Sequence, residues 1–146
     1  MGRPRGFDEA DVLAAAAAAF GRRGYEATSV DDLVTATGLH RGSLYKAFAS
    51  KRGLFLAVLA RHVEEVLPAA LERARDGADL VGGDVLDLVL VAALEAAPHD
   101  PSAAALVRTA CDLLADRGLA AAPPAGVPPV ATALLGARLA ARWPTP

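Results

Sequence analysis

Within the segment 28–48, TSVDDLVTATGLHRGSLYKAF, side chains that suit nucleic acid follow signals for two short helices. Arg41 and Lys46 can reach base edges, and an arginine pairs with guanine through two hydrogen bonds. Ser43 and Tyr45 carry hydroxyls that suit phosphate oxygens, which fix the register of a protein on a duplex without reading its sequence. These residue types in this order indicate contact with double-stranded DNA rather than catalysis.

Two short helices joined by a tight turn must hold these side chains. Thr28 or Ser29 can cap the first helix, and Asp31 and Asp32 follow at the spacing of a capping box. Gly38 stands where a sharp turn between helices often needs a positive φ. A helix-turn-helix places its second helix in the major groove, with the N-terminal residues near base edges. The segment therefore predicts a DNA-binding motif over residues 28–48.

Residues around the motif are expected to add contacts. Lys51 begins the next helix and would hold the DNA backbone, while Gly42 would let the recognition helix approach closely. His40 is either a contact or simply a loop residue, and Arg5 is either a minor-groove arm or part of a basic tail. The expected DNA-binding set is Arg5, Thr28, Ser29, Thr37, Leu39, His40, Arg41, Gly42, Ser43, Tyr45, Lys46 and Lys51.

The segment and the helix before it resemble the N-terminal domain of the TetR family of bacterial repressors. Phe20, Gly24 and Tyr25 fit the family pattern F-x-x-x-G-[YF], and LYKAFASKRGLFLAVL fits L-Y-x-x-F-x-[SN]-K-[ED]-x-L-[FL]. The resemblance covers about residues 7–60 without a gap. Arg52 and Gly53 depart from it, because the family often has an acidic residue and its neighbour there.

The resemblance implies an all-α fold in two parts. Residues 1–50 would form a three-helix DNA-binding domain, and residues 51–146 a shortened helical domain for effector binding and dimerisation. It also implies a homodimer on a palindromic operator, acting as a repressor that a small hydrophobic effector releases. The candidate residues for the effector are Arg108 and Cys111, and those for the dimer interface are Leu134, Leu135 and Leu139.

The C-terminal part leaves a second interpretation open. Trp143 is the only aromatic residue beyond residue 60, so an aromatic-lined pocket is not expected. Cys111 also fits a small buried hydrophobe, as free cysteines in apolar helices often are. The alternative is a shortened helical relative that acts without an effector or as a protein-interaction module.

Composition supports this class of protein and argues against others. The net charge is −2, but residues 1–61 hold nine Lys/Arg and six Asp/Glu, while residues 62–146 hold six and eleven. A basic first part suits a nucleic-acid face on an acidic body. The single cysteine and three scattered histidines give neither a disulfide nor metal-ligand spacing. With no catalytic motif and no long apolar run, we expect no enzyme, cofactor, metal or membrane partner, and a cytoplasmic location.

Apolar periodicity and capping residues predict helices along most of the chain. Ser50 would cap the fourth helix, and Pro68 would kink or end it, because proline removes a hydrogen bond. Pro101 fits the first turn of a later helix. The expected helices cover about 8–23, 29–37, 40–47, 51–68, a further stretch to about 75, 84–97, 102–117 and 129–142.

Overall fold

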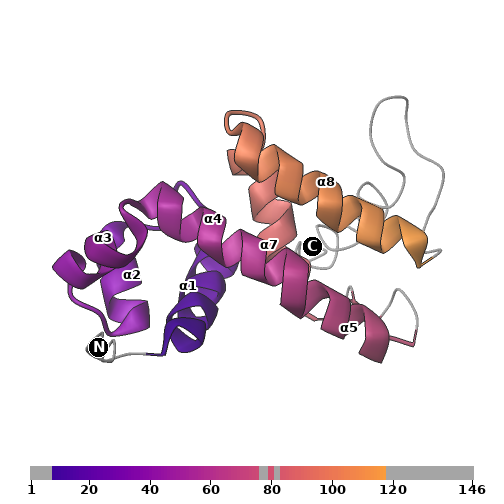
Figure 1. The fold of residues 1–146 in the computed structure, drawn as a ribbon, viewed down its shortest axis with the longest axis horizontal. Coiled ribbons are helices and arrows are strands. Elements are labelled where there is room, and N and C mark those ends of the chain that lie inside the picture. Colours follow the sequence, from indigo (N-terminus) through magenta and orange to yellow (C-terminus); the bar gives the residue numbers. More distant parts are fainter. Residues whose placement is uncertain (1–7, 76–78, 81–82, 118–146) are drawn as a thin grey trace, which may run out of the picture.

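The structure is a computed structural model that describes residues 8–75, 79–80 and 83–117. That part of the chain is helical and contains no strand, which confirms the predicted all-α class (Figure 1). A long rod of successive helical segments crosses the molecule, with α1, α2 and α3 gathered at one end and α8 lying along the other half. We call residues 8–50 the head and residues 51–117 the body. Within the described ranges, no helix is both long and apolar enough to span a membrane.

Helix α1, Glu9–Arg23, begins at a side-chain cap and ends at a glycine. The Asp8 carboxylate accepts a hydrogen bond of 2.9 Å from the Ala10 N–H. The buried face includes Ala16 and Phe20, which are both fully inaccessible to solvent. Gly24 then turns the chain with φ of 93°, a conformation that side chains other than glycine rarely adopt.

Helices α2, Val30–Thr37, and α3, Arg41–Phe48, form the predicted motif. Of the two predicted candidates, Ser29 and not Thr28 is the cap of α2, and Asp32 completes the capping box. These hydrogen bonds to Ser29 hold the pKa of Asp32 below its ordinary value. Gly38 ends α2 with φ of 70°, so the predicted left-handed turn is confirmed.

A strained turn joins α3 to α4, Lys51–Arg61. Ala49 has φ of 66°, and the Ser50 N–H bonds to the Phe48 carbonyl at 2.8 Å, a three-residue turn of the rare, strained kind. Ser50 caps α4 as predicted, accepting from the Gly53 N–H at 2.9 Å. The backbone of Gly53 lies so close to the Phe48 carbonyl oxygen that a methyl group there would overlap that oxygen. The junction therefore requires glycine at this position.

The long helix does not end at Pro68. A π turn over His62–Val66 follows α4 and leads directly into α5, Leu67–Arg73. The Leu67 N–H bonds to the His62 carbonyl, five residues back, just before the proline that has no N–H of its own. The wider turn accommodates the proline ring, so the helix does not end there and runs on into the stretch that the sequence predicted to about residue 75.

The rest of the body consists of α7, Asp87–Val91, a second π turn, Ala92–Ala96, and α8, Pro101–Asp116. The predicted helix over 84–97 thus begins three residues late, after a turn. Asp100 caps α8, and Pro101 occupies its first turn as predicted. The predicted helix over 129–142 lies outside the described residues.

One hydrophobic core runs through the head and the body. Phe20 and Phe55 meet edge to face with ring centroids 5.0 Å apart, and Tyr25 lies 4.7 Å from Phe55. The same cluster continues through the long helix to Leu114 of α8. The head is therefore packed directly on the body, and the domain boundary at residue 50 remains a prediction.

We expect Gly53→Ala to lower the free energy of unfolding by about 1–3 kcal/mol, the usual cost of forcing atoms into a filled space. Gly42→Ala is the matched control, because nothing lies within 4 Å of a methyl group there. That change should stabilise the protein by up to about 1 kcal/mol through helix propensity. Urea denaturation of the two variants checks this, and equal stabilities would contradict the close approach at Gly53.

The buried His62 should make stability depend on pH. Its Nε2 lies 2.6 Å from the Val85 carbonyl oxygen, and burial lowers the pKa of the imidazole, although that hydrogen bond and Asp84 oppose the shift. The unfolded chain then binds more protons than the folded one, so stability is complete above about pH 6.5 and falls below it. In denaturation between about pH 7.5 and 5.5, on either side of that ordinary pKa, His62→Gln should weaken this dependence. The change His99→Gln, at an exposed histidine, should leave this pH dependence unchanged. If both variants showed the same pH dependence of stability, His62 would not be its source.

Candidate nucleic-acid interface

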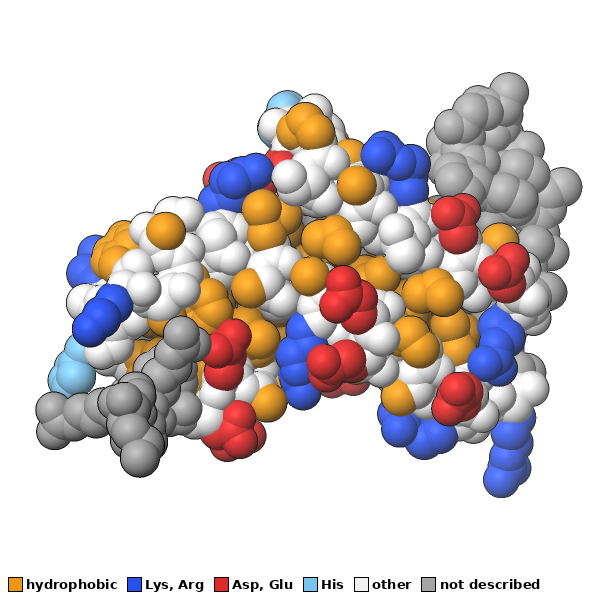
Figure 2. Space-filling view, viewed as in Figure 1, with side chains coloured by type: hydrophobic (Ala, Val, Ile, Leu, Met, Phe, Trp, Pro, Cys, Tyr) orange, Lys and Arg blue, Asp and Glu red, His pale blue; other side chains and the backbone are white. Residues whose placement is uncertain are grey.

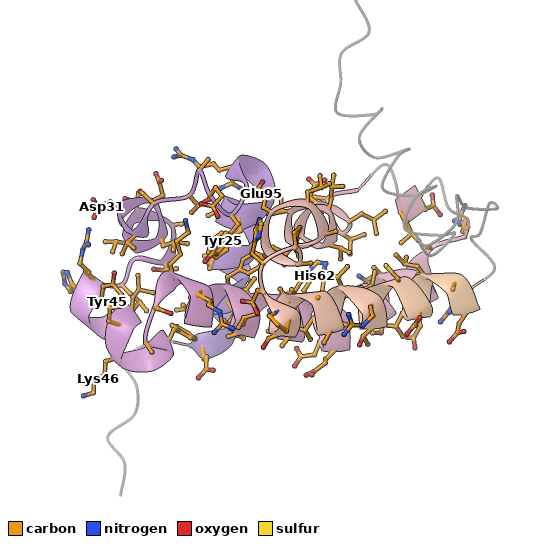
Figure 3. The ribbon with its side chains drawn as sticks, turned by 90° about the horizontal axis from the view of Figure 1, so that it is seen from above. Tyr25, Asp31, Tyr45, Lys46, His62 and Glu95 are labelled. Atoms are coloured by element: carbon orange, nitrogen blue, oxygen red, sulfur yellow. The ribbon has the colours of Figure 1, made fainter. Side chains whose placement is uncertain are left out.

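Helix α3 separates its core residues from an exposed polar face. Leu44 is buried, whereas Arg41, Ser43, Tyr45 and Lys46 are exposed. Figure 3 shows Tyr45 and Lys46 at the end of the molecule farthest from the body, with Lys46 projecting outward. In Figure 2, basic side chains and a histidine gather at the same end. The structure thus brings these predicted residues together on one accessible face.

Arg41 is held by an ion pair that the sequence did not predict. Its Nη2 lies 2.6 Å from Oδ1 of Asp31, which reaches across from the first turn of α2. The hydrogen bond to Asp31, and to a smaller extent Tyr45, raises the pKa of the guanidinium. Arg41 therefore has a preferred position in front of α3 before any ligand arrives.

The side chain of Thr28, a predicted contact residue, does not reach the surface. It is fully buried, and its hydroxyl donates to the Gly24 carbonyl oxygen at 2.6 Å. Ser29 is exposed, but its hydroxyl donates to Asp32 at 2.7 Å and accepts from the Asp32 N–H at 3.1 Å. Both hydroxyls are thus engaged within the protein, and a DNA contact by Thr28 or Ser29 stays a prediction.

The turn residues also support the motif. The Thr37 hydroxyl donates to the Leu33 carbonyl oxygen at 2.7 Å and accepts from the Leu39 N–H at 3.3 Å. Leu39 is half-buried and packs against the core. His40 precedes α3 with an exposed side chain that makes no capping hydrogen bond. Its ring is therefore not committed to the helix end, and the two interpretations of His40 both stay predictions.

Lys51 has a position fixed by an aromatic ring. Its Nζ lies 4.5 Å from the centre of the Tyr25 ring and 3.4 Å from the Glu26 carbonyl oxygen. A cation over an aromatic face gains about 0.5–1 kcal/mol at exposed sites. The pKa of the Tyr25 hydroxyl is raised, mainly by burial and further by the negative charges of Glu26 and Asp100. The ammonium group of Lys51 is thus held beside the turn between α1 and α2.

A carboxylate of the body clamps that same turn. Glu95 Oε2 accepts the Glu26 N–H at 2.8 Å, and a methyl group at Gly24 would lie 2.5 Å from the other carboxylate oxygen. Figure 3 shows Glu95 close to Tyr25, where the body meets the head. No local signal predicts this contact, because 69 residues separate its two partners.

A second ion pair joins α4 to the cap of α8. Arg52 donates to both oxygens of Asp100, at 2.6 and 3.0 Å. This pairing lowers the pKa of Asp100, whose side chain is only 14% exposed. The charge of Arg52, which departs from the family pattern, is thus paired with a carboxylate 48 residues away.

The predicted effector residues both lie on α8, in different surroundings. Cys111 is buried, and burial raises the pKa of its thiol, whereas Arg108 is exposed. A groove of about 390 Å³ lies elsewhere, between α1, the π turn that contains His62 and residues 84–88, and neither residue lines it. Arg5 and the predicted interface residues Leu134, Leu135 and Leu139 lie outside the described residues.

Comparison with known proteins relates the first part of the chain to helix-turn-helix regulators. Residues 12–58 match the family described as bacterial regulatory proteins, tetR family. Over 73 residues the chain is 44% identical to the uncharacterized regulator YezE of Bacillus subtilis, covering 50% of this chain and 38% of YezE. It is 49% identical over 63 residues to the repressor ComR of Escherichia coli, and this match covers 43% of this chain and 30% of ComR. The chain is also 36% identical over 76 residues to the activator FasR of Mycolicibacterium smegmatis, and this match covers 52% of this chain and 35% of FasR. The matched regions span less than two thirds of these relatives.

Solved structures extend the similarity into the body. A cysteine variant of the TetR family transcriptional regulator CifR, in complex with a 26-base-pair operator DNA, matches with a TM-score of 0.55 and 26% identity. The match covers 97% of this chain and 90% of that one. A second CifR variant with operator DNA matches with a TM-score of 0.55 and 25% identity, over 97% of this chain and 92% of that one. The relatives and structures matched here are all described as transcriptional regulators, repressors or activators.

The contact between Glu95 and the head can be tested directly. We expect Glu95→Ala to lower the free energy of unfolding by about 1 kcal/mol, because it leaves the Glu26 N–H without its acceptor. Amide exchange at Glu26 should become faster in this variant. The neighbouring Leu94 is 60% exposed, so Leu94→Ala serves as the control and should leave that exchange rate unchanged. Unchanged protection of the Glu26 amide in Glu95→Ala would show that the clamp does not form in solution.

Proposed function

We propose that this chain, which belongs to the TetR family of bacterial regulatory proteins, binds an operator in duplex DNA through α3 and regulates transcription there. The observation that carries the proposal is the exposed face of α3, which presents Arg41, Ser43, Tyr45 and Lys46 on a motif held by capped turns. A helix of this kind fits the major groove, where its first residues read base edges.

Each exposed residue has a role in this proposal. Arg41 reads a base, since its guanidinium can pair with guanine, and Lys46 adds a second cation on the same helix. Ser43 and Tyr45 bind phosphate oxygens and set the register of α3 on the duplex. Gly42 lies between them in open space, so the backbone of α3 can come close to the groove. Lys51, whose ammonium group is held over the Tyr25 ring, contacts the phosphate backbone of the DNA beside α2.

The finer parts of the proposal concern assembly and control. Residues 1–50 bind DNA and residues 51–146 dimerise and bind an effector, so two copies of α3 read a palindromic operator. We place the dimer contact at Leu134, Leu135 and Leu139. The chain acts as a repressor, and a small hydrophobic effector in the body releases it from DNA in the cytoplasm.

A second function is the alternative to the main proposal. The chain would bind DNA without an effector, or would use its helices only to bind another protein. The low aromatic content of the chain beyond residue 60 is the feature that favours this alternative. Its interaction-module form predicts no salt-dependent DNA binding, which separates it from the main proposal.

Duplexes selected from a random library, together with the DNA upstream of the gene, provide the operator for the test. Arg41→Ala should weaken operator binding by about 1–3 kcal/mol and relax selection at one base position. Tyr45→Phe should cost about 1 kcal/mol without changing the selected sequence. Arg108→Ala removes the same charge from the exposed face of α8 and should bind like the parent. If a dimer makes about 6–10 phosphate contacts, log K should fall with log salt at a slope of about −5 to −9. A flat salt dependence would support the interaction module instead.

A further inference from the structure

Asp31 lies in the first turn of α2 and is the residue on which the position of Arg41 depends. Its side chain is 81% exposed, and its carboxylate accepts the 2.6 Å bond from Arg41 Nη2. Asp32, the next residue, has a different task, because it completes the cap of α2 and pairs with Arg23 at 2.7 Å. The cap of α2 therefore does not need the Asp31 carboxylate.

We infer that Asp31 is a positioning residue that aims Arg41 at a base and thereby raises the preference of the protein for its operator over other DNA. The inference rests on the proposed function and adds a specificity role for a residue that makes no base contact itself. A free arginine side chain on a helix surface samples many rotamers. A partner that fixes one of them reduces the ordering that binding would otherwise require.

The geometry leaves Arg41 able to read a base while it is held. A guanidinium has five N–H donors in a planar fork, and a guanine needs two of them for its O6 and N7 atoms. The bond to Asp31 comes from Nη2. The pair also spans two helices, so the guanidinium is fixed relative to both α2 and α3. This is the arrangement in which a second residue holds the orientation of the first.

The charge of Asp31 has a separate effect, on affinity. An exposed ion pair adds little to the stability of the fold, so stability does not explain it. In the proposed complex, a carboxylate near the DNA repels phosphates at every sequence, which weakens binding to DNA in general. This repulsion is the same for operator and other DNA, so a change in the ratio of the two affinities reports the positioning of Arg41.

The test compares the parent with Asp31→Asn, which keeps the shape of the side chain and removes its charge. The control is Glu72→Gln, since Glu72 is exposed on α5 and its loss changes the net charge equally. Affinities are measured at one salt concentration for the selected operator and for a scrambled duplex of equal length. We expect Asp31→Asn to bind the scrambled duplex more tightly and to lose about five-fold in the ratio of the two affinities, the scale of an exposed pair. Glu72→Gln should keep the parent ratio.

A double variant separates positioning from simple repulsion. In an Arg41→Ala background, Asp31→Asn should tighten binding to both duplexes equally and leave their ratio unchanged. The positioning role would be overturned if Asp31→Asn lowered the ratio as much in that background as it does when Arg41 is intact. An unchanged ratio in Asp31→Asn alone would overturn it as well.

The free protein gives a readout that does not involve DNA. Relaxation of the Arg41 Nε–Hε group in NMR should show an ordered side chain in the parent and a more mobile one in Asp31→Asn. Equal mobility in the two proteins would overturn the inference whatever the DNA results. If the parent shows no salt-dependent binding to any duplex, the proposed function fails and this role fails with it. Normal operator binding with an unchanged ratio would overturn the role of Asp31 alone.

Discussion

The contact among Phe20, Tyr25 and Phe55 is the interaction on which the position of the whole head depends. These three rings join the end of α1, the turn that follows it and the start of the long helix. Because Tyr25 also carries Lys51 on its ring, the same cluster fixes a cation near the turn. Aromatic pairs of this geometry contribute about 0.5–1.5 kcal/mol beyond the area they bury. A head attached in this way takes its orientation from α4.

Polar contacts at the edge of this cluster refine that orientation. Glu95 binds the backbone of the turn after Gly24, and Asp100 pairs with Arg52 one turn before Phe55. Both carboxylates belong to the segment between α7 and α8. A movement of that segment would therefore reach the start of α2 through short, directional bonds. The exposed polar face of α3, with Ser43, Tyr45 and Lys46, takes no part in these contacts.

The sequence predicted the parts of the site that local chemistry determines. Gly38, the capping box of α2 and the Ser50 cap each act within a few residues, so their spacing indicates them, although it left Thr28 and Ser29 as equal candidates for the cap of α2. The burial of Thr28 was not predicted, because a hydroxyl beside a helix start gives the same sequence signal whether it faces solvent or the Gly24 carbonyl. The partners of Glu95 and Arg52 lie 69 and 48 residues away, and only the folded chain brings them together. Pairing over such distances leaves no periodic trace in the sequence.

The π turn before Pro68 also determines how the long helix keeps its apolar side inward. The buried residues of its stripe recur every four positions, at Phe55, Leu59, Val63, Leu67 and Leu71. In a regular α-helix of about 3.6 residues per turn, a spacing of four advances by about 40° each time, or about 160° along this stripe. The wider turn takes up part of that rotation, so residues on both sides of it share one core. For the ancestry of the chain, this means that gaining or losing one residue between His62 and Val66 would rotate α5 about its axis. Length is therefore constrained in this helix even at positions, such as Glu64, where the identity of the exposed side chain is not.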